Sequence, residues 1–110
     1  MISLVIPCYN EEKNINEFFI RCQEVFDEDV EYIFINDGSQ DCTYEKIQDL
    51  SRYYSHEKII GINFSRNFGK ESAMLAGLKK ASGDYISVID ADLQQDPIYV
   101  LKMVDFFKVS

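Results

Sequence analysis

The sequence predicts an α/β fold in three layers, with a mainly parallel β-sheet between two layers of helices. Four short apolar segments have the length and the β-branched content of buried strands. Segments with apolar residues at helical spacing alternate with them, and no linker, repeat or low-complexity stretch interrupts this order. Near-continuous apolar strands that alternate with helices are typical of parallel sheets joined by right-handed crossovers.

The length and composition fit one globular domain, which we expect to span residues 1–110. Hydrophobic residues make up 46% of the chain, enough for a core, and the net charge of −8 argues against nucleic acid or an anionic membrane surface as a partner. Cys8, Cys22 and Cys42 are odd in number and form no Cys-x-x-Cys pair, which favours a reduced, cytoplasmic segment without disulfides or a zinc site. The chain shows no signal peptide, and no apolar stretch reaches the ~20 residues that span a bilayer.

The first strand is predicted at Ile2–Ile6 and is expected to stop at Pro7, which has no N–H for a sheet ladder. Asn10 is then a candidate N-cap, with Glu11 and Glu12 in the first turn of a helix, where the helix dipole favours acidic side chains. The apolar stripe of that helix consists of Ile15, Phe18, Phe19, Cys22, Val25 and Phe26.

The second strand, Tyr32–Ile35, leads into the turn signal Asn36–Ser39. A helix is expected from about Asp41, followed by a third strand at Lys58–Phe64. His56 is the sole histidine and stands in a polar linker, so we expect a solvated loop residue rather than a catalytic base.

The third helix follows the polar loop Ser65–Lys70 and is expected to end at Gly83, a natural C-cap residue. The fourth strand is Tyr85–Ile89, and the acidic loop Asp90–Asp96 follows it. Asp96-Pro97 then provides an N-cap and a proline at the first position of the last helix.

Four polar turns follow the four strands, so all are expected at one edge of the sheet. These turns are Pro7–Glu12, Asn36–Ser39, Ser65–Lys70 and Asp90–Asp96. In parallel sheets, ligands bind outside the carboxyl ends of the strands, where the strand order reverses. The four turns therefore predict one common site.

The acidic loop carries the clearest chemistry of the four turns. Asp90, Asp92 and Gln94 would present oxygen ligands, which suit Mg²⁺ or Mn²⁺ bound together with substrate phosphates. The alternative is a solvated acidic loop whose aspartates only cap the following helix.

The other turns offer groups for recognising a nucleotide. Asp37 would accept hydrogen bonds from a base or a ribose hydroxyl, unless it only completes an Asx-type turn. Tyr9 would stack on a base, with Glu11 as an acceptor or merely as a helix-dipole partner. Arg66 and Lys70 would contact phosphates or simply offset the acidic edge.

Several common sites are excluded by the sequence. No Gly-x-Gly-x-x-Gly follows the first strand, no P-loop motif is present, and no nucleophile–base pair is visible. A receiver-like Mg²⁺-binding signalling domain is the alternative of similar size and charge. Against it, the first strand ends in Pro-Cys-Tyr-Asn, where acidic residues would be needed. The function that the sequence still allows is the metal-assisted binding and reaction of a nucleotide diphosphate compound.

Four segments resemble the successive motifs of inverting GT-A-type glycosyltransferases of family 2, in particular those that act on polyprenyl phosphates. The segments are Ile2–Glu12 (ISLVIPCYNEE), Asn36–Asp41 (NDGSQD), Ser65–Glu71 (SRNFGKE) and Asp90–Pro97 (DADLQQDP). The resemblance implies the Rossmann-like nucleotide-binding half of a GT-A fold, a UDP- or GDP-sugar as donor, Mg²⁺ or Mn²⁺ as cofactor and a polyprenyl phosphate as acceptor.

The resemblance also implies roles for individual residues. It implies that the nucleoside is contacted by Pro7, Tyr9, Glu11 and Asp37. Asp90 and Ala91 would lie against the ribose and diphosphate, and Asp92 with Gln94 would hold the metal. Asp90 and Asp92 are thereby the catalytic candidates, and Arg66 and Lys70 match a loop near the donor.

Members of this family have a longer catalytic domain, and the polyprenyl-phosphate subgroup usually adds membrane-associated helices. We therefore expect a membrane-associated full-length protein whose catalytic domain faces the cytoplasm. The isolated chain, as the N-terminal part alone, is expected to bind the donor weakly and to transfer no sugar. An uncovered sheet edge along Tyr85–Ile89 is expected to favour homo-oligomers.

Overall fold

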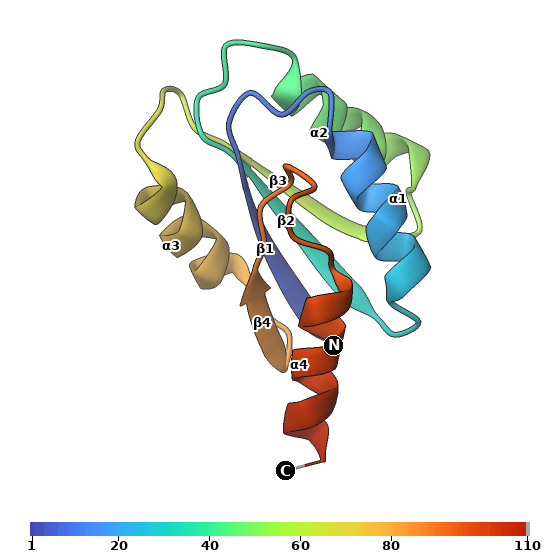
Figure 1. The fold of residues 1–110 in the computed structure, drawn as a ribbon. Helices are drawn as coiled ribbons and strands as arrows, with labels where there is room; N and C mark the ends of the chain where they lie inside the picture. Colours follow the sequence, from blue (N-terminus) through green and yellow to red (C-terminus); the bar gives the residue numbers. More distant parts are fainter. Residues whose placement is uncertain (110) are drawn as a thin grey trace.

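The computed structural model describes residues 1–109 and has the predicted alternation of strands and helices (Figure 1). The strands are β1 (Ile2–Cys8), β2 (Val30–Asn36), β3 (Lys58–Asn63) and β4 (Tyr85–Val88). The helices are α1 (Ile15–Val25), α2 (Thr43–Tyr53), α3 (Lys70–Lys80) and α4 (Ile98–Lys108). Across residues 1–109, no helix has the length and apolar character needed to cross a membrane.

The four strands form one parallel sheet in the order β3-β2-β1-β4. The predicted α/β class is therefore confirmed. The chain moves outward from β1 to β3 and then returns to place β4 on the other side of β1, so the strand order reverses between β1 and β4. This order differs from the 2-1-3-4-5 order of receiver-like sheets, which removes that alternative.

Pro7 lies inside β1 rather than at its end, which corrects the predicted boundary. Pro7 and Cys8 pair with β2, opposite Ile35 and Asn36. On the other side, the last bond to the β4 segment runs from the Ile89 N–H to the Val5 carbonyl, at 3.0 Å. Because Pro7 has no N–H, it removes a donor only on the side where β4 no longer pairs. β1 and β4 therefore separate beyond this point.

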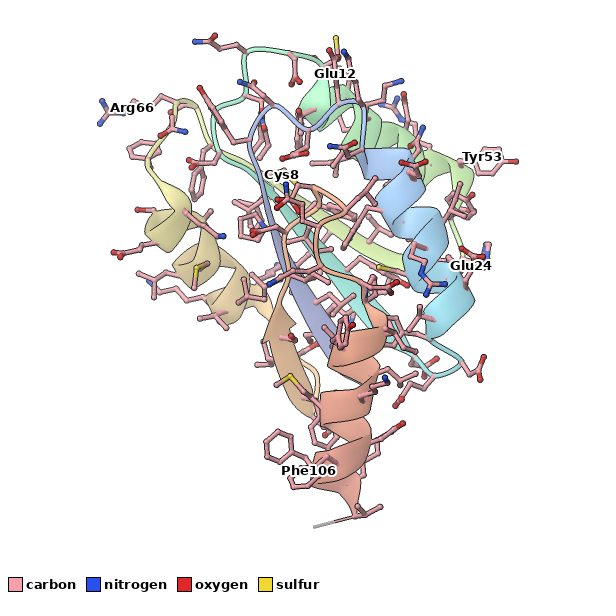
Figure 2. All side chains as sticks on the ribbon, in the orientation of Figure 1. Cys8, Glu12, Glu24, Tyr53, Arg66 and Phe106 are labelled. Atoms are coloured by element: carbon pink, nitrogen blue, oxygen red, sulfur yellow. The ribbon has the colours of Figure 1, made fainter. Side chains whose placement is uncertain are left out.

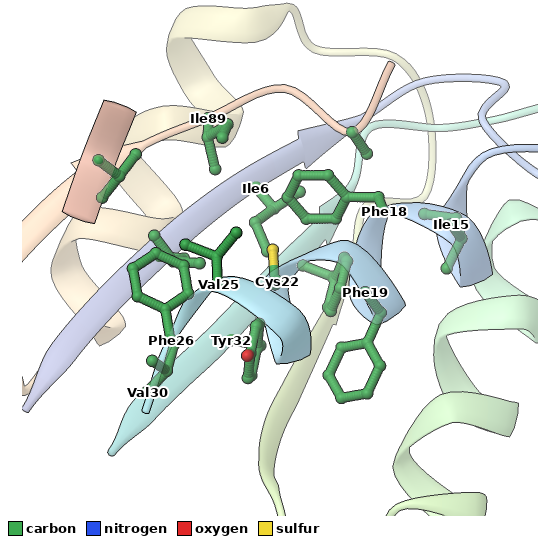
Figure 3. Close-up of a cluster of buried hydrophobic side chains, with 14 of the residues drawn as sticks. Ile6, Ile15, Phe18, Phe19, Cys22, Val25, Phe26, Val30, Tyr32 and Ile89 are labelled. Carbon is green, nitrogen blue, oxygen red and sulfur yellow. The ribbon is translucent and has the colours of Figure 1, made fainter. Parts of the chain in front are cut away.

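The larger part of the core lies between the sheet and the helices α1, α2 and α4. Figure 3 shows α1 placing Phe18, Phe19 and Cys22 against the sheet. The rings of Phe19 and Tyr32 pack edge to face with centroids 4.9 Å apart. Aromatic pairs at this distance add to the stability gained from burial.

The opposite face of the sheet is covered by α3, as Figure 1 shows. Val5, Ile33 and Ile35 pack there against Ala73. The close approach of α3 requires Gly77, since a Cβ at this position would lie 2.3 Å from Cγ1 of Val5.

A buried carboxylate joins the amino ends of the strands. Glu31, 1% exposed, accepts hydrogen bonds from the Ser3 hydroxyl at 2.8 Å and the Ser82 N–H at 2.9 Å. The Lys58 ammonium lies 2.9 Å from Oε2 of Glu31. Gly83 follows α3 without capping it, because α3 ends at Lys80. A Cβ on Gly83 would lie 2.6 Å from the Ser3 hydroxyl, so close packing explains this glycine.

The start of α1 also differs from the prediction. The helix begins at Ile15, and Asn10 has a φ of +53°, so Asn10 is not its N-cap. The Asn10 side chain instead accepts the Gln40 N–H at 2.9 Å. Glu11 and Glu12 lie in the turn before the helix rather than in its first turn.

Candidate functional site

A cavity of about 150 Å³ opens at the carboxyl edge of the sheet, where β1 and β4 separate. This is the edge at which parallel sheets bind ligands. The lining residues are Pro7, Cys8, Tyr9, Glu11, Asp37, Lys70, Asp90 and Asp92. All four predicted turns contribute to the cavity, so the structure brings them together as the sequence indicated.

Three predicted site residues do not line this cavity. Ala91 is 1% exposed and belongs to the core beneath it. Gln94 is exposed at the far end of the acidic loop. Arg66 lies at the outer tip of its loop, pointing away from the sheet (Figure 2), with its guanidinium 4.6 Å from the centre of the Phe68 ring.

The two aspartates of the acidic loop have different partners. Oδ2 of Asp90 lies 2.8 Å from the Lys70 ammonium, across the cavity at the start of α3. Oδ1 of Asp92 accepts the Gln94 N–H at 3.1 Å, and Leu93 between them has a φ of +67°. Asp92 therefore stabilises the acidic loop internally, whereas Asp90 connects this loop to the loop 65–70.

The end of the acidic loop is fixed by Asp96. Its Oδ1 accepts the N–H of Ile98, the first residue of α4, at 3.0 Å. Pro97 rather than Asp96 is the N-cap, so the helix begins one residue later than predicted. Oδ2 of Asp96 lies 3.0 Å from Nη2 of Arg21 on α1. The Ile98 N–H and the Arg21 guanidinium together lower the pKa of the Asp96 carboxyl. The ion pair between Arg21 and Asp96 connects the acidic loop to α1.

Asp37, only 4% exposed, holds the loop that leads to α3. Its carboxylate accepts the Phe68 N–H at 2.8 Å and the Gly69 N–H at 3.2 Å. The Asn67 side-chain amide donates to the Asp37 backbone carbonyl at 3.2 Å. Asp37 therefore does more than complete its own turn, because its carboxylate binds backbone about thirty residues away.

The glycine after Asp37 allows this loop to approach closely. Gly38 has a φ of +67°, and a Cβ there would lie 2.2 Å from the Arg66 carbonyl carbon and 2.2 Å from the Asn67 nitrogen. An L side chain is disfavoured at this φ and has no space. Both features fix the turn 36–39 against the loop 65–70.

The turn after β1 is joined to the turn after β2. The Asn10 N–H donates to the Ser39 hydroxyl at 2.9 Å, and the Glu11 N–H donates to the Thr43 hydroxyl at 2.9 Å. Oε2 of Glu11 accepts the Asn14 side-chain amide at 2.8 Å. These contacts place Tyr9, 45% exposed, beside the cavity with its ring available for stacking.

Cys8 lines the cavity and was not predicted as a site residue. Its thiol donates to the Ile6 carbonyl at 3.4 Å. Burial, with smaller contributions from the Glu11 and Asp90 carboxylates, raises the pKa of the Cys8 thiol well above its usual range. Cys8 therefore remains a neutral wall residue. Its position directly after the first apolar run was the signal that could have placed it here.

The side chains at this edge fit a divalent cation only with help from a bound ligand. Asp90 and Asp92 both line the cavity and offer carboxylate oxygens, which are the ligands that Mg²⁺ and Mn²⁺ prefer. Within residues 1–109, no three His, Cys, Asp or Glu side chains converge to hold a metal by themselves. Two carboxylates completed by substrate phosphates are a common arrangement for Mg²⁺.

The chain resembles known glycosyltransferases in sequence. It is 45% identical over 109 residues to an uncharacterized glycosyltransferase of Bacillus subtilis, YkcC, covering 96% of this chain and 33% of that protein. It is 48% identical over 103 residues to the bactoprenol glucosyl transferase of Shigella phage SfV, covering 91% of this chain and 33% of that protein. The chain thus spans about a third of the length of these relatives.

Solved structures show the same fold. A mannosyltransferase of Pyrobaculum calidifontis, in complex with GDP-Man and Mn²⁺, matches with a TM-score of 0.78 and 22% identity, over 83% of this chain and 27% of that one. Glucosyl-3-phosphoglycerate synthase of Mycobacterium tuberculosis, in complex with Mn²⁺, UDP and glucosyl-3-phosphoglycerate, matches with a TM-score of 0.74 and 26% identity, over 97% of this chain and 39% of that one.

The family model described as glycosyl transferase family 2 matches residues 3–109, almost the whole chain. The fold similarity to the solved glycosyltransferase structures agrees with this match. The chain belongs to glycosyl transferase family 2.

Proposed function

We propose that this chain binds a nucleotide sugar at the carboxyl edge of its sheet, as the donor-binding part of an inverting glycosyltransferase. The observation that carries this proposal is the cavity between β1 and β4, where two carboxylates face a tyrosine and the turn after β2. The names of the relatives and the nucleotides in the solved structures support it.

The turns after β1 and β2 bind the nucleoside in this proposal. The nucleoside lies against Pro7, Tyr9, Glu11 and Asp37, where Tyr9 stacks on the base. The carboxylate of Asp37 has two oxygens with several lone pairs, so it accepts a base or ribose donor in addition to the Phe68 and Gly69 N–H groups.

The acidic loop binds the diphosphate end of the donor. Asp90 and the Ala91 backbone lie along the ribose and diphosphate, and Asp92 with Gln94 holds Mg²⁺ or Mn²⁺. A bound cation supplies charge neutralisation for the departing nucleoside diphosphate. Gln94 is exposed, and its N–H donates to Oδ1 of Asp92 at 3.1 Å, so the loop already holds these two residues next to each other.

The acceptor in this proposal is a polyprenyl phosphate, and the full-length protein is membrane-associated. Support comes from the bactoprenol glucosyl transferases among the relatives. A phosphate monoester is already anionic near neutral pH, so it attacks the anomeric carbon without a strong general base. The exposed position of His56, with 76% of its side chain accessible, is consistent with a reaction that needs no histidine.

The isolated chain is expected to bind nucleotide without transferring sugar. Its cavity of about 150 Å³ is smaller than the about 300–1,000 Å³ usual for small-molecule sites. The chain also spans only about a third of the length of the relatives that it matches. Transfer of labelled sugar to undecaprenyl phosphate by the 110-residue chain would contradict this expectation.

Nucleotide binding is tested by NMR titration of this 12.8 kDa chain with UDP and with GDP, each with and without Mn²⁺. We expect perturbed amides at Tyr9, Asp37 and Asp90, and stronger nucleotide binding with the metal. Asp92→Asn should lose the effect of the metal, whereas Asp105→Asn on the exposed face of α4 should retain it. No perturbation by either nucleotide, or equal metal effects in the two variants, would overturn the proposal.

A further inference from the structure

We propose that Lys70 and a divalent cation compete for Asp90, and that a nucleoside diphosphate ends the competition by taking over the Lys70 ammonium. Lys70 thereby couples metal binding to nucleotide binding. The inference rests on the proposed function, because it assumes that a diphosphate binds at this edge of the sheet. It adds Asp90, whose carboxylate also lines the cavity, to Asp92 and Gln94 as an oxygen ligand of the cation.

The first observation is the ion pair itself. The Lys70 ammonium lies 2.8 Å from Oδ2 of Asp90, and the Asp90 side chain is only 33% exposed. Asp90 is also one of the two acidic-loop carboxylates in the cavity. A cation that uses Asp90 as a ligand must therefore displace this ammonium or lie beside a like charge, which weakens its binding.

The second observation is the charge balance of the cavity. Its lining contains four carboxylates, those of Glu11, Asp37, Asp90 and Asp92, and Lys70 is its one basic residue. A diphosphate in this cavity would meet carboxylates on several sides. The Lys70 ammonium is then the only cationic side chain among the described lining residues that attracts the phosphates without a metal.

The third observation is the way Lys70 is held. The two residues before it, Phe68 and Gly69, donate their N–H groups to Asp37 at 2.8 and 3.2 Å. The backbone that carries Lys70 is therefore fixed to the turn after β2. The Lys70 side chain is 58% exposed and has a flexible four-carbon stem. The ammonium can therefore change partner while the backbone stays in place.

Arg66 belongs to the same loop as Lys70, but its cation does not reach the cavity. Its guanidinium lies over the Phe68 ring, and its side chain points away from the sheet (Figure 2). Of the two cations in the loop 65–70, only Lys70 contacts an acidic-loop carboxylate. We therefore assign the coupling to Lys70 and none of it to Arg66.

The test compares Lys70→Met with Lys79→Met by NMR and by Mn²⁺ relaxation. Lys79 is exposed in the last turn of α3, so both variants change the net charge equally. For Mn²⁺ alone, Lys70→Met should bind about twofold to fivefold more tightly than the wild type, the range of an exposed ion pair. For UDP or GDP without metal, it should bind about tenfold more weakly.

Lys70→Arg keeps the positive charge, so it should show neither the tighter Mn²⁺ binding nor the weaker nucleotide binding expected of Lys70→Met. Lys79→Met should match the wild type in both titrations. The opposite signs of the two changes are the signature of competition, because a general loss of structure would weaken both ligands.

Outcomes that overturn the inference are distinct from those that overturn the proposed function. If wild-type chain binds nucleotide but Lys70→Met and Lys79→Met behave alike, or if Mn²⁺ binds no variant, Lys70 does not couple the ligands. If neither UDP nor GDP perturbs the wild-type amides with or without Mn²⁺, the proposed function fails and the inference fails with it.

Discussion

A hydrogen bond between Asp37 and Phe68 joins two turns of the candidate site. Oδ1 of Asp37 accepts the Phe68 N–H at 2.8 Å, although the two residues are 31 positions apart in the chain. Asp37 is nearly buried, and its second oxygen accepts the Gly69 N–H. The position of the loop before α3 therefore depends on a carboxylate that the sequence indicates as a nucleotide ligand or as part of a turn, but not as a support for this loop.

Replacing Asp37 by asparagine should release this loop. An asparagine side chain has one acceptor oxygen, and its NH₂ group would face the Phe68 or Gly69 N–H. We expect a loss of about 1–3 kcal/mol in the free energy of unfolding and faster amide exchange at Phe68 and Gly69. Asp49→Asn, at an exposed position of α2, should change neither quantity. Unchanged amide exchange at Phe68 in Asp37→Asn would contradict the assigned contact.

The stability of the domain should fall at acid pH because of Glu31. Burial alone would raise the pKa of its carboxyl, but hydrogen bonds from the Ser82 N–H, the Lys58 ammonium and the Ser3 and Ser82 hydroxyls outweigh burial and lower the pKa to about 2. The folded-state pKa lies below the unfolded one, so the contribution is present above about pH 4.5 and is lost as the pH falls toward 2. Its size is about 3 kcal/mol.

Urea unfolding at pH 7 and at pH 3 measures this contribution. Glu31→Gln should lower the stability at pH 7 and remove a large part of the difference between the two pH values. Glu24→Gln, at an exposed position of α1, should leave the pH dependence as in the wild type. Equal pH dependence in the two variants would show that Glu31 is not the group responsible.

Gly38→Ala should be more damaging than Gly69→Ala. Both glycines have positive φ, +67° and +102°, so an alanine is strained at either position, at a cost of about 1–3 kcal/mol. Only at Gly38 would the Cβ also collide with backbone, at 2.2 Å from the Arg66 carbonyl carbon, while nothing lies within 4 Å at Gly69. Chemical denaturation compares the two variants. Equal losses would mean that the loop moves away from Gly38 without cost.

The free edge of β4 should allow the chain to self-associate. In the described part of the chain, β4 pairs only with β1, and Ile86 on this strand is 46% exposed. An unprotected edge strand is a template for pairing with another chain. Sedimentation should show a concentration-dependent dimer that Ile86→Lys weakens. Leu75→Lys, at an exposed position of α3, is the matched control. A wild-type chain that stays monomeric at high concentration would refute the expectation.

The fold was predictable because its signals are local. Each strand is a short apolar run, and each helix has an apolar stripe that matches its buried face, as α1 shows with Ile15, Phe18 and Phe19. Parallel strands place the residues that follow them at one edge, so the convergence of four turns in one cavity also followed from the order of elements.

The parts that could not be predicted depend on contacts between turns. Asn10 suits a helix N-cap as well as a left-handed turn, and only its contacts with Ser39 and Gln40 decide between them. The same holds for Lys70, whose two interpretations as phosphate ligand or counter-ion depend on Asp90, twenty residues later. The roles assigned to individual residues toward nucleotide and metal remain predictions.

The separation of β1 and β4 beyond Val5 has a consequence for the order of folding. The cavity lies between the first strand and the last, and β4 joins β1 through only four paired residues. Pairing across this sequence distance closes a long loop, so it follows the local contacts of the first three strands. A growing chain on the ribosome would therefore have most of this core before it has a binding site, and nucleotide binding would report the pairing of β4 with β1.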